Sequence, residues 1–306
     1  MDHPITVRNL HKKYRGETVV ENVSFSVNRG EIFGILGPNG AGKTTTVEIL
    51  QGLRSRQGGT VDVLGYDPAR ESGSLRRKIG SQLQSAALPD RMRVQESIAL
   101  FSRAHDADVD VDDVLERWSL TELRRRAFAT LSGGQAQRLF LALALLGNPE
   151  VVFLDELTTA LDPTARRATW ELVREVRDKG ATIILVTHFM EEAEALCDRV
   201  AIMDRGRIVA LDSPGRLTTH HGEEMSVTFT ANGHDPNHLS TVDGVRSVSV
   251  EAGTVTLEGD LSIPVGVASA LADQGFFPTD FRTHHPSLED VFLSMTGRSL
   301  TSREAS

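Results

Sequence analysis

The sequence predicts an α/β fold with a mostly parallel core sheet, extended by an antiparallel β subdomain and a helical subdomain, and followed by a small α+β domain. A glycine-rich loop at residues 37–44 lies between an apolar run and a segment compatible with a helix. Residues 151–154 and 182–186 are continuous apolar runs with a helical pattern between them, which indicates parallel strands covered by helices on both faces. From about residue 222 the chain changes to short segments in which apolar and polar residues alternate. This change predicts the second, smaller domain.

Length and composition set the domain organisation. The chain has 306 residues, of which 40% are hydrophobic, and this is enough for a sizeable core. We expect domains at residues 1–219 and 220–298, and a frayed tail at residues 299–306. The net charge is −9, with 42 acidic residues against 33 lysines and arginines. A dedicated nucleic-acid-binding protein normally has a strongly basic face, so no nucleic acid partner is expected.

Several features point to the cytoplasm. The single cysteine, Cys197, excludes an internal disulfide and a cysteine-based zinc site, which fits a reducing compartment. The longest apolar run, residues 139–147, is far shorter than the roughly 20 residues that a membrane-spanning helix needs. The first residues lack a basic segment followed by an apolar one, so no signal peptide is expected.

The elements of the first domain follow from their patterns. Three segments alternate apolar and polar residues, which predicts an antiparallel sheet with one solvated face: residues 5–7, 23–27 and 61–64. Three helical patterns form the expected helical subdomain at about residues 85–147: residues 94–104, 111–118 and 121–127. A further helix is expected at residues 163–179, with Asp162 as its N-cap and Pro163 in its first turn.

Strands and one helix complete the expected fold. Residues 199–203 and 207–210 should form a hairpin around the turn that they enclose. In the C-terminal domain we expect three strands and then a helix: residues 225–230, 245–250, 254–258 and 264–274.

The glycine-rich loop matches the pattern G-x-x-x-x-G-K-[ST] at Gly37, Gly42, Lys43 and Thr44. Glycines let backbone N–H groups turn inward around an anion, and the following helix adds the positive end of its dipole. The pattern predicts that Lys43 reaches the β and γ phosphates of a nucleoside triphosphate, and that Thr44 offers its hydroxyl to Mg²⁺. The predicted nucleotide-binding residues of this loop are Gly37, Pro38, Asn39, Gly40, Ala41, Gly42, Lys43, Thr44 and Thr45. A plain glycine-rich turn is the alternative.

A second glycine-rich turn precedes a long apolar helix. Residues 131–138 read LSGGQAQR, and Ser132 stands where a helix N-cap belongs. Two glycines at the start of a helix leave backbone N–H groups open, which predicts a second anion site. The octapeptide resembles the signature sequence of ATP-binding cassette (ABC) ATPases. The resemblance implies the ABC cassette fold of P-loop NTPases, with these signature residues: Leu131, Ser132, Gly133, Gly134 and Gln135.

The ABC resemblance assigns a catalytic set to the strand ends. Asp155 resembles the Walker B aspartate that holds Mg²⁺ through water, and Glu156 resembles the catalytic glutamate that orients the attacking water. His188 resembles the switch histidine at the γ-phosphate. Lys43 completes the charge compensation around the phosphates. An acidic pair that only solvates a turn, and a surface histidine at a strand end, are the alternatives.

Three further residues have family counterparts. Gln84 resembles the Q-loop glutamine, which contacts Mg²⁺ and the catalytic water and communicates with a membrane partner, and Gln82 is its rival for this role. Tyr14 resembles the aromatic residue that stacks on adenine, or it only packs on the antiparallel sheet. Asp162 matches the D-loop aspartate and can cap its helix as well.

The resemblance also implies how the site is completed. The signature turn would close over the ATP of a second copy, so that a homodimer holds two ATP molecules with Mg²⁺. The family usually has proline at Leu157 and glycine at Ala160. If residue 160 needs a left-handed backbone, alanine costs about 1–2 kcal/mol, which the fold should tolerate. These departures raise the hypothesis of slower hydrolysis.

The end of the chain resembles a subgroup. Residues 286–297 read PSLEDVFLSMTG, which is similar to the end of bacterial export ATPases of the daunorubicin-resistance type, whose membrane subunits are separate polypeptides. The resemblance implies a peripheral location on the inner face of the cell membrane, bound to a permease. Residues 85–126 would form the groove for a cytoplasmic helix of that permease.

Two other classes of function remain open. One is a non-transport ABC ATPase, which usually has a coiled-coil insertion or two tandem cassettes, and the sequence has neither. The other is a nucleotide-gated binding module with little turnover, suggested only by Leu157 and Ala160. His220-His221 and His284-His285 are expected to be solvent-exposed rather than metal ligands, because no cysteine or carboxylate spacing accompanies them.

Overall fold

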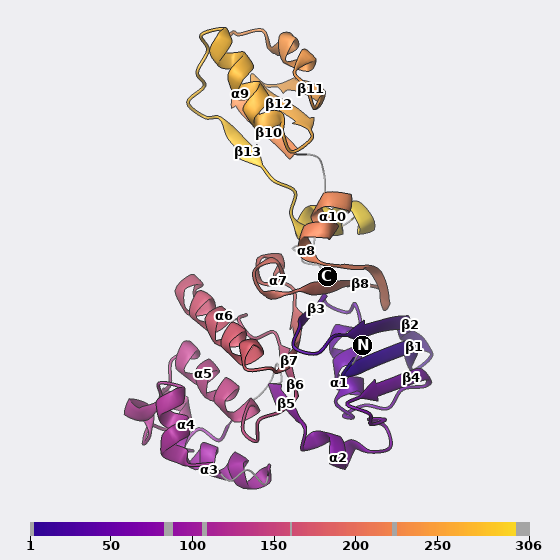
Figure 1. The fold of residues 1–306 in the computed structure, drawn as a ribbon, viewed down its shortest axis with the longest axis vertical. Helices are drawn as coiled ribbons and strands as arrows, with labels where there is room; N and C mark the ends of the chain where they lie inside the picture. Colours follow the sequence, from indigo (N-terminus) through magenta and orange to yellow (C-terminus); the bar gives the residue numbers. More distant parts are fainter. Residues whose placement is uncertain (1–2, 83–87, 106–108, 160, 222–224, 298–306) are drawn as a thin grey trace. The chain divides into compact units, whose positions relative to one another are not determined.

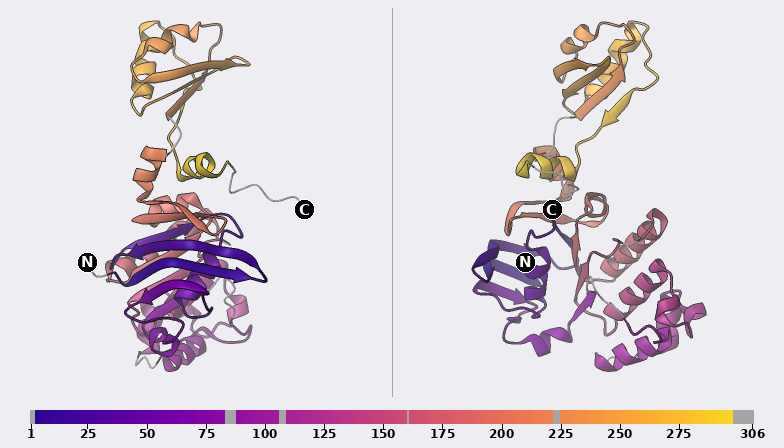
Figure 2. Two further views of the ribbon diagram at one scale, coloured as in Figure 1. Left: turned by 90° about the vertical axis from the view of Figure 1, so that its right-hand side faces the viewer. Right: turned by 180° about the vertical axis from the view of Figure 1, so that it is seen from behind.

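The chain divides into two compact units, Met1–Pro214 and Gly215–Ser306 (Figure 1, Figure 2). The computed structural model describes residues 3–82, 88–105, 109–159, 161–221 and 225–297. Each unit has a hydrophobic core formed by its own residues.

A six-stranded sheet forms the centre of the first unit. Five strands are parallel, in the spatial order β5 (Ile79–Gln82), β6 (Val151–Asp155), β7 (Thr182–Thr187), β3 (Ile32–Leu36) and β8 (Arg199–Asp204). β9 (Arg207–Asp212) pairs with β8 in the antiparallel direction. Every residue of β3, β6 and β7 is buried, because helices and the second sheet cover both faces, and this explains the continuous apolar runs. The predicted parallel sheet and the predicted hairpin are confirmed.

A three-stranded antiparallel sheet packs beside the core sheet. β1 (Ile5–Tyr14) lies between β2 (Glu17–Val27) and β4 (Gly58–Val63). α1 (Lys43–Leu50) lies between the two sheets, and its side chains share one hydrophobic core with both of them (Figure 1). The predicted antiparallel sheet is confirmed, and its strands extend beyond the predicted segments into residues with exposed side chains.

The helical part of the first unit lies on the opposite side from the antiparallel sheet (Figure 1, Figure 2). Its helices are α3 (Val94–Ala104), α4 (Val111–Arg117) and α5 (Gly133–Ala144). The prediction of a helix at residues 121–127 is wrong, because only a 3₁₀ turn, Thr121–Leu123, forms there. A second 3₁₀ turn follows at Phe128–Thr130. The carbonyls of Arg124 and Arg126 instead accept hydrogen bonds from the N–H groups of Gln95 and Val94, each at 3.1 Å. The backbone of this segment caps α3 rather than forming its own helix.

The remaining helices of the first unit differ in whether the sequence predicts them. α6 (Pro163–Asp178) begins at the predicted cap, where Asp162 accepts hydrogen bonds from the N–H groups of Thr164 and Ala165, each at 2.9 Å. α2 (Ser72–Arg76) and α7 (Met190–Leu196) were not predicted, because such short helices show little periodicity. Within the described ranges, no helix is both long enough and apolar enough to cross a membrane.

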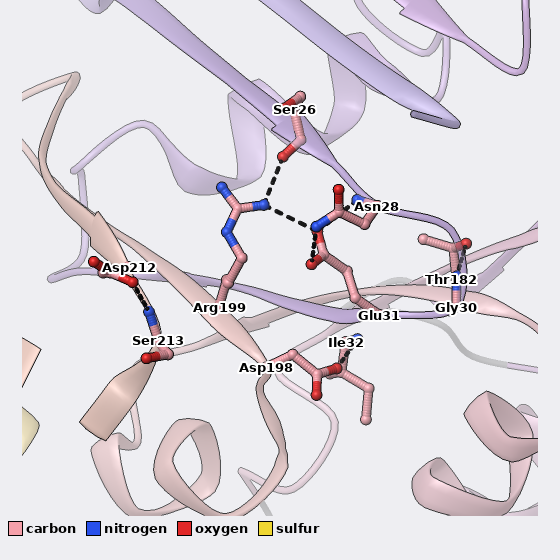
Figure 3. Close-up of polar contacts among 10 residues, drawn as sticks. All are labelled: Ser26, Asn28, Gly30, Glu31, Ile32, Thr182, Asp198, Arg199, Asp212 and Ser213. Atoms are coloured by element: carbon pink, nitrogen blue, oxygen red, sulfur yellow. Dashed lines mark hydrogen bonds and ion pairs between the residues drawn. The ribbon is translucent and has the colours of Figure 1, made fainter. Parts of the chain in front are cut away.

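A polar network ties the turn between β2 and β3 to the start of β8 (Figure 3). Glu31, which is 6% exposed, accepts hydrogen bonds from the backbone N–H of Asn28 at 2.6 Å and from its Nδ2 at 2.8 Å. Arg199 donates to Glu31 Oε1 at 3.2 Å and to the carbonyl of Ser26 at 3.1 Å. These contacts hold the end of the antiparallel sheet against the core sheet.

The second unit is built on a four-stranded antiparallel sheet. The spatial order is β11 (Val245–Glu251), β12 (Thr254–Gly259), β10 (Met225–Thr230) and β13 (Arg282–His284). α9 (Ile263–Asp273) contributes three buried residues to the core beneath this sheet. The other elements are α8 (Pro214–His221), the 3₁₀ helix Pro236–Thr241 and α10 (Leu288–Thr296). The predicted α+β architecture is confirmed.

Candidate functional site

Three neighbouring strands end at one edge of the core sheet. β7 lies between β6 and β3, and the register pairs Asp155 with Val186 and Leu36 with Thr187. The residues that follow these strand ends, including Glu156, therefore come together where ligands bind in open parallel sheets.

Two positions of the loop between β3 and α1 require glycine. Gly37 has φ of 149° and Gly42 has φ of 95°. A Cβ atom at Gly37 would lie 2.2 Å from the carbonyl oxygen of Met203, and one at Gly42 would lie 2.5 Å from that of Val19. The loop is also bound to the β8–β9 hairpin, because the N–H of Gly206 donates to the carbonyl of Ala41 at 3.1 Å. The two glycines of the sequence pattern are thus required by the packing of this loop.

Lys43 lies inside the curve of this loop. Its side chain is 5% exposed, and Nζ donates hydrogen bonds to the carbonyls of Gly37 at 2.7 Å and Pro38 at 3.0 Å. Burial lowers the pKa of Lys43, and the carboxylates of Glu156 and Asp155 partly oppose this effect. The ammonium group therefore faces both the loop backbone and the two acids at the end of β6.

The start of α1 presents open polar groups beside Lys43. Gly42 is the N-cap residue and supplies no side-chain cap to the first N–H groups of the helix. Thr44 is exposed and Thr45 is half-buried, whereas Thr46 is buried and donates its hydroxyl to the carbonyl of Gly42 at 2.8 Å. Asn39 and Gly40 are exposed at the tip of the loop. This arrangement offers N–H groups and the helix dipole to an anion.

Asp155 is a buried carboxyl group with an unused oxygen. The residue is 4% exposed, and among the described residues its Oδ1 atom has no hydrogen-bond partner. The pKa of Asp155 is raised to about 6, mainly by burial and also by the negative charge of Glu156, while Lys43 partly opposes these effects. Mg²⁺ is held by one or two carboxylates together with waters and phosphates, so this orphaned oxygen fits the chemistry of a magnesium site. The described part of the chain holds no group of three or more histidine, cysteine, aspartate or glutamate side chains that could bind a metal ion.

Glu156 and His188 face each other across the strand ends. Oε1 of Glu156 lies 3.3 Å from Nδ1 of His188, an ion-pair distance without hydrogen-bond geometry. The N–H of Glu156 donates to the carbonyl of Val186 at 2.9 Å, and its φ of 50° is unusual for a residue other than glycine. Strained backbone of this kind clusters at functional sites, and the resulting direction of the carboxylate allows it to orient a water molecule.

The signature turn is exposed. Ser132 accepts a hydrogen bond from the N–H of Gln135 at 3.4 Å, and Gln135 returns one by accepting from the N–H of Ser132 at 3.0 Å, which confirms the predicted N-cap. Ser132 and Gly133 are exposed, whereas Leu131, Gly134 and Gln135 are half-buried. The turn is accessible to another molecule, as the sequence hypothesis requires.

The two glutamine candidates differ in what can be described. Gln84 lies outside the described residues. Gln82 is 7% exposed at the end of β5, and its Oε1 accepts a hydrogen bond from Nε2 of Gln137 in α5 at 3.0 Å. Gln137 belongs to the octapeptide at residues 131–138, but it was not among the predicted site residues. Only the fold brings it to β5.

Tyr14 stands at the end of the β1–β2 hairpin and is partly exposed. Its hydroxyl accepts a hydrogen bond from Arg54 at 2.9 Å, and Nζ of Lys12 lies 5.0 Å from the ring centroid. The guanidinium of Arg54 also lies over this ring, 5.6 Å from its centroid, and the stacking of Tyr14 on adenine stays a prediction.

The remaining sequence candidates are Leu157, Ala160 and the two histidine pairs. Leu157 is buried, and Ala160 lies outside the described residues. Nε2 of His284 lies 3.1 Å from Asp290, and His285 is exposed. The side chains of His220 and His221 lie outside the described part of the chain.

Comparison with known proteins adds the family. Residues 20–159 match the sequence profile of the ABC transporter family. A daunorubicin resistance ATP-binding protein of Streptomyces coeruleorubidus is 35% identical over 99% of each chain. A Nod factor export ATP-binding protein of Ralstonia nicotianae is 37% identical over 97% of this chain and 94% of its own length. A solved structure of the ATP-binding subunit of an ABC transporter is 29% identical with a TM-score of 0.64, covering 70% of this chain and 92% of that chain. The chain therefore belongs to the ABC transporter family, as an ATP-binding protein related over its full length to the daunorubicin resistance proteins.

Proposed function

We propose that this chain hydrolyses ATP as the nucleotide-binding subunit of an export system, and that two copies dimerise on ATP to drive a separate membrane permease. Family membership implies ATP hydrolysis. The observation that carries the proposal is the meeting of Lys43, Asp155, Glu156 and His188 at the ends of three adjacent strands.

Each of these residues has a role in phosphoryl transfer to water. Lys43 and the open N–H groups at the start of α1 bind the β and γ phosphates. Asp155, through water, and Thr44 would hold Mg²⁺, which would supply positive charge against the phosphate oxygens. Glu156 would orient the attacking water, and His188 would donate to the γ-phosphate. From the family resemblance, Gln84 would contact the ion and the water, and Tyr14 would stack on the adenine.

The homodimer follows from the second glycine-rich turn. Ser132 and Gly133 are exposed at the start of α5, where a helix N-terminus favours an anion. A two-fold axis would bring this turn of one copy against the ATP of the other, and Asp162 at the start of α6 would lie at the same interface. ATP thus favours the closed dimer, and hydrolysis opens it.

An export role is supported by the relatives and by a groove in the first unit. Both relatives described above are ATP-binding proteins of resistance or export systems. A cavity of about 300 Å³ is lined by residues of β5 and of the helices α3 and α5, and its apolar lining includes Leu53, Leu88, Phe101 and Phe140. Gln82, two residues before Gln84 in the sequence, lines it as well, so we expect a permease helix bound here to contact the Q-loop. We therefore propose that the chain lies on the cytoplasmic face of the membrane.

The substitution Glu156→Gln tests the hydrolysis. It keeps the shape of the side chain but removes its ability to attract a proton from water, so steady-state phosphate release should fall about 10²–10⁴-fold. Binding of ATP with Mg²⁺ should persist, and the variant should accumulate as a dimer in gel filtration with ATP. Glu171→Gln removes the same charge from an exposed position on α6 and should leave the rate unchanged.

A small effect of Glu156→Gln would favour the nucleotide-gated binding module instead. A non-transport ABC ATPase would behave like the transporter subunit in this assay but would not co-purify with a protein of about six hydrophobic spans. Phosphate release that is unchanged by Glu156→Gln, together with ATP binding that Lys43→Ala does not abolish, would contradict the proposed site.

A further inference from the structure

Glu192 is a buried carboxylate that the proposed hydrolysis does not yet use. It lies in α7, four residues after His188, and its exposed fraction is 0%. Among the described residues, no lysine or arginine lies within ion-pair distance of it. Burying a carboxylate without a cationic partner is costly, so the position calls for a physical reason.

The contacts of Glu192 join three elements around a single atom. Its Oε1 atom accepts a hydrogen bond from the hydroxyl of Thr158 at 2.8 Å and one from Nε1 of Trp170 at 3.1 Å. Thr158 is fully buried in the loop after β6, and Trp170 is 7% exposed in α6. The second oxygen, Oε2, is buried with no hydrogen-bond partner in the described part of the chain.

These contacts join the two chain segments that carry Glu156 and His188. Thr158 follows Glu156 by two residues, and its carbonyl also accepts a hydrogen bond from the N–H of Leu161 at 3.1 Å, next to Asp162. On its other side, the N–H of Glu156 donates to the carbonyl of Val186, two residues before His188. The segment that carries Glu156 is therefore held to the segment that carries His188 at two places.

We propose that Glu192 is a positioning residue for the proposed ATP hydrolysis, which binds the Thr158 hydroxyl and the Trp170 indole and so fixes Glu156 relative to His188. A carboxylate suits this role because two donors converge on one oxygen, and charged acceptors make the stronger hydrogen bonds. A glutamine could still accept from both donors through its one oxygen, but a neutral acceptor makes the weaker hydrogen bonds. A carboxylate therefore holds the Thr158 hydroxyl and the Trp170 indole more firmly than a glutamine would.

Steady-state hydrolysis by the full chain tests this role. Glu192→Gln should lower kcat by about 10- to 100-fold, because small displacements of a catalytic group cost that much. The KM for ATP with Mg²⁺ should change less than about threefold, since Lys43 and the phosphate loop are untouched. Glu191→Gln is the matched control, because Glu191 is the exposed neighbour on the same helix, 3.9 Å from Arg166.

Two milder variants can be made at Thr158. They test the positioning role of Glu192 if Glu192→Gln does not fold. Thr158→Val removes the hydroxyl and should lower kcat, whereas Thr158→Ser keeps the hydroxyl and should restore most of the rate. The double variant Thr158→Val, Glu192→Gln should be no slower than Glu192→Gln alone, because both changes break the same contact.

Two results would overturn the proposal. One is a kcat of Glu192→Gln within twofold of that of Glu191→Gln. The other is equal loss of rate in Thr158→Val and Thr158→Ser. A wild-type rate no higher than that of Glu156→Gln would instead refute the proposed hydrolysis itself, and the positioning role with it.

Discussion

Asp155 shows how one side chain can reduce the stability of the chain for the sake of its site. Its pKa rises from 3.8 to about 6, with burial as the largest cause. The folded chain therefore favours the protonated carboxyl group. The corresponding stabilisation is fully present below pH 3.8 and is lost as the pH rises through about 6. The shift corresponds to about 3 kcal/mol.

Asp155→Asn should therefore change the pH dependence of stability. Without nucleotide, the free energy of unfolding of the wild type relative to this variant should fall by about 2 kcal/mol between roughly pH 4 and pH 7. Urea denaturation at several pH values measures this difference. Asp67→Asn is the control, because hydrogen bonds from Arg56 lower the pKa of Asp67 to about 2 and its contribution changes by less than about 0.5 kcal/mol over this pH range. A constant difference for Asp155→Asn would contradict the raised pKa.

Residues of the site were predictable where the chemistry is local in sequence. Gly37 and Gly42 stand in a pattern that depends on loop geometry, and the structure shows that a side chain at either would collide with a backbone carbonyl. Glu192 and Gln137 were not predictable, because their partners Thr158 and Gln82 lie far away in the sequence. A buried carboxylate on an unpredicted short helix gives no local signal.

At the scale of elements, the polar network around Glu31 determines how the two sheets of the first unit meet (Figure 3). Glu31→Ala should lower the free energy of unfolding by about 2–4 kcal/mol, because it removes three hydrogen bonds and leaves Arg199 without its carboxylate. Urea denaturation of the full chain measures the change. Glu21→Ala breaks an exposed pair with Arg207 and should have little measurable effect. Equal changes in the free energy of unfolding for the two variants would show that the network around Glu31 does not stabilise the fold.

Element prediction succeeded where a segment contains its own start signal. The predicted bounds of α3 agree with the structure, and its cap is local, because the Glu96 carboxylate accepts a hydrogen bond from the N–H of Arg93 at 2.9 Å. Residues 121–127 have a helical pattern, yet their carbonyls bind the start of α3. That long-range competition cannot be read from one segment, since propensity is a weak prior that tertiary contacts override.

At the scale of the whole molecule, we propose that the two units are separate folding domains. Each has its own hydrophobic core, and the two cores have no residue in common. Units of this kind unfold as separate cooperative transitions unless a large apolar interface couples them. The nucleotide site proposed here lies entirely within the first unit, so ATP should stabilise that unit alone.

Calorimetry of the full chain tests this independence. In the Glu156→Gln background, ATP with Mg²⁺ at about 100 times its Kd should stabilise one transition by about 2.7 kcal/mol and leave the other in place. Leu257→Ala, in the core of the second unit, should destabilise that other transition by about 2–5 kcal/mol. Val265→Ala, at a position 78% exposed on α9, should move neither. If ATP and Leu257→Ala shift one common transition, the units unfold together, and the effect of nucleotide must then extend through the whole chain.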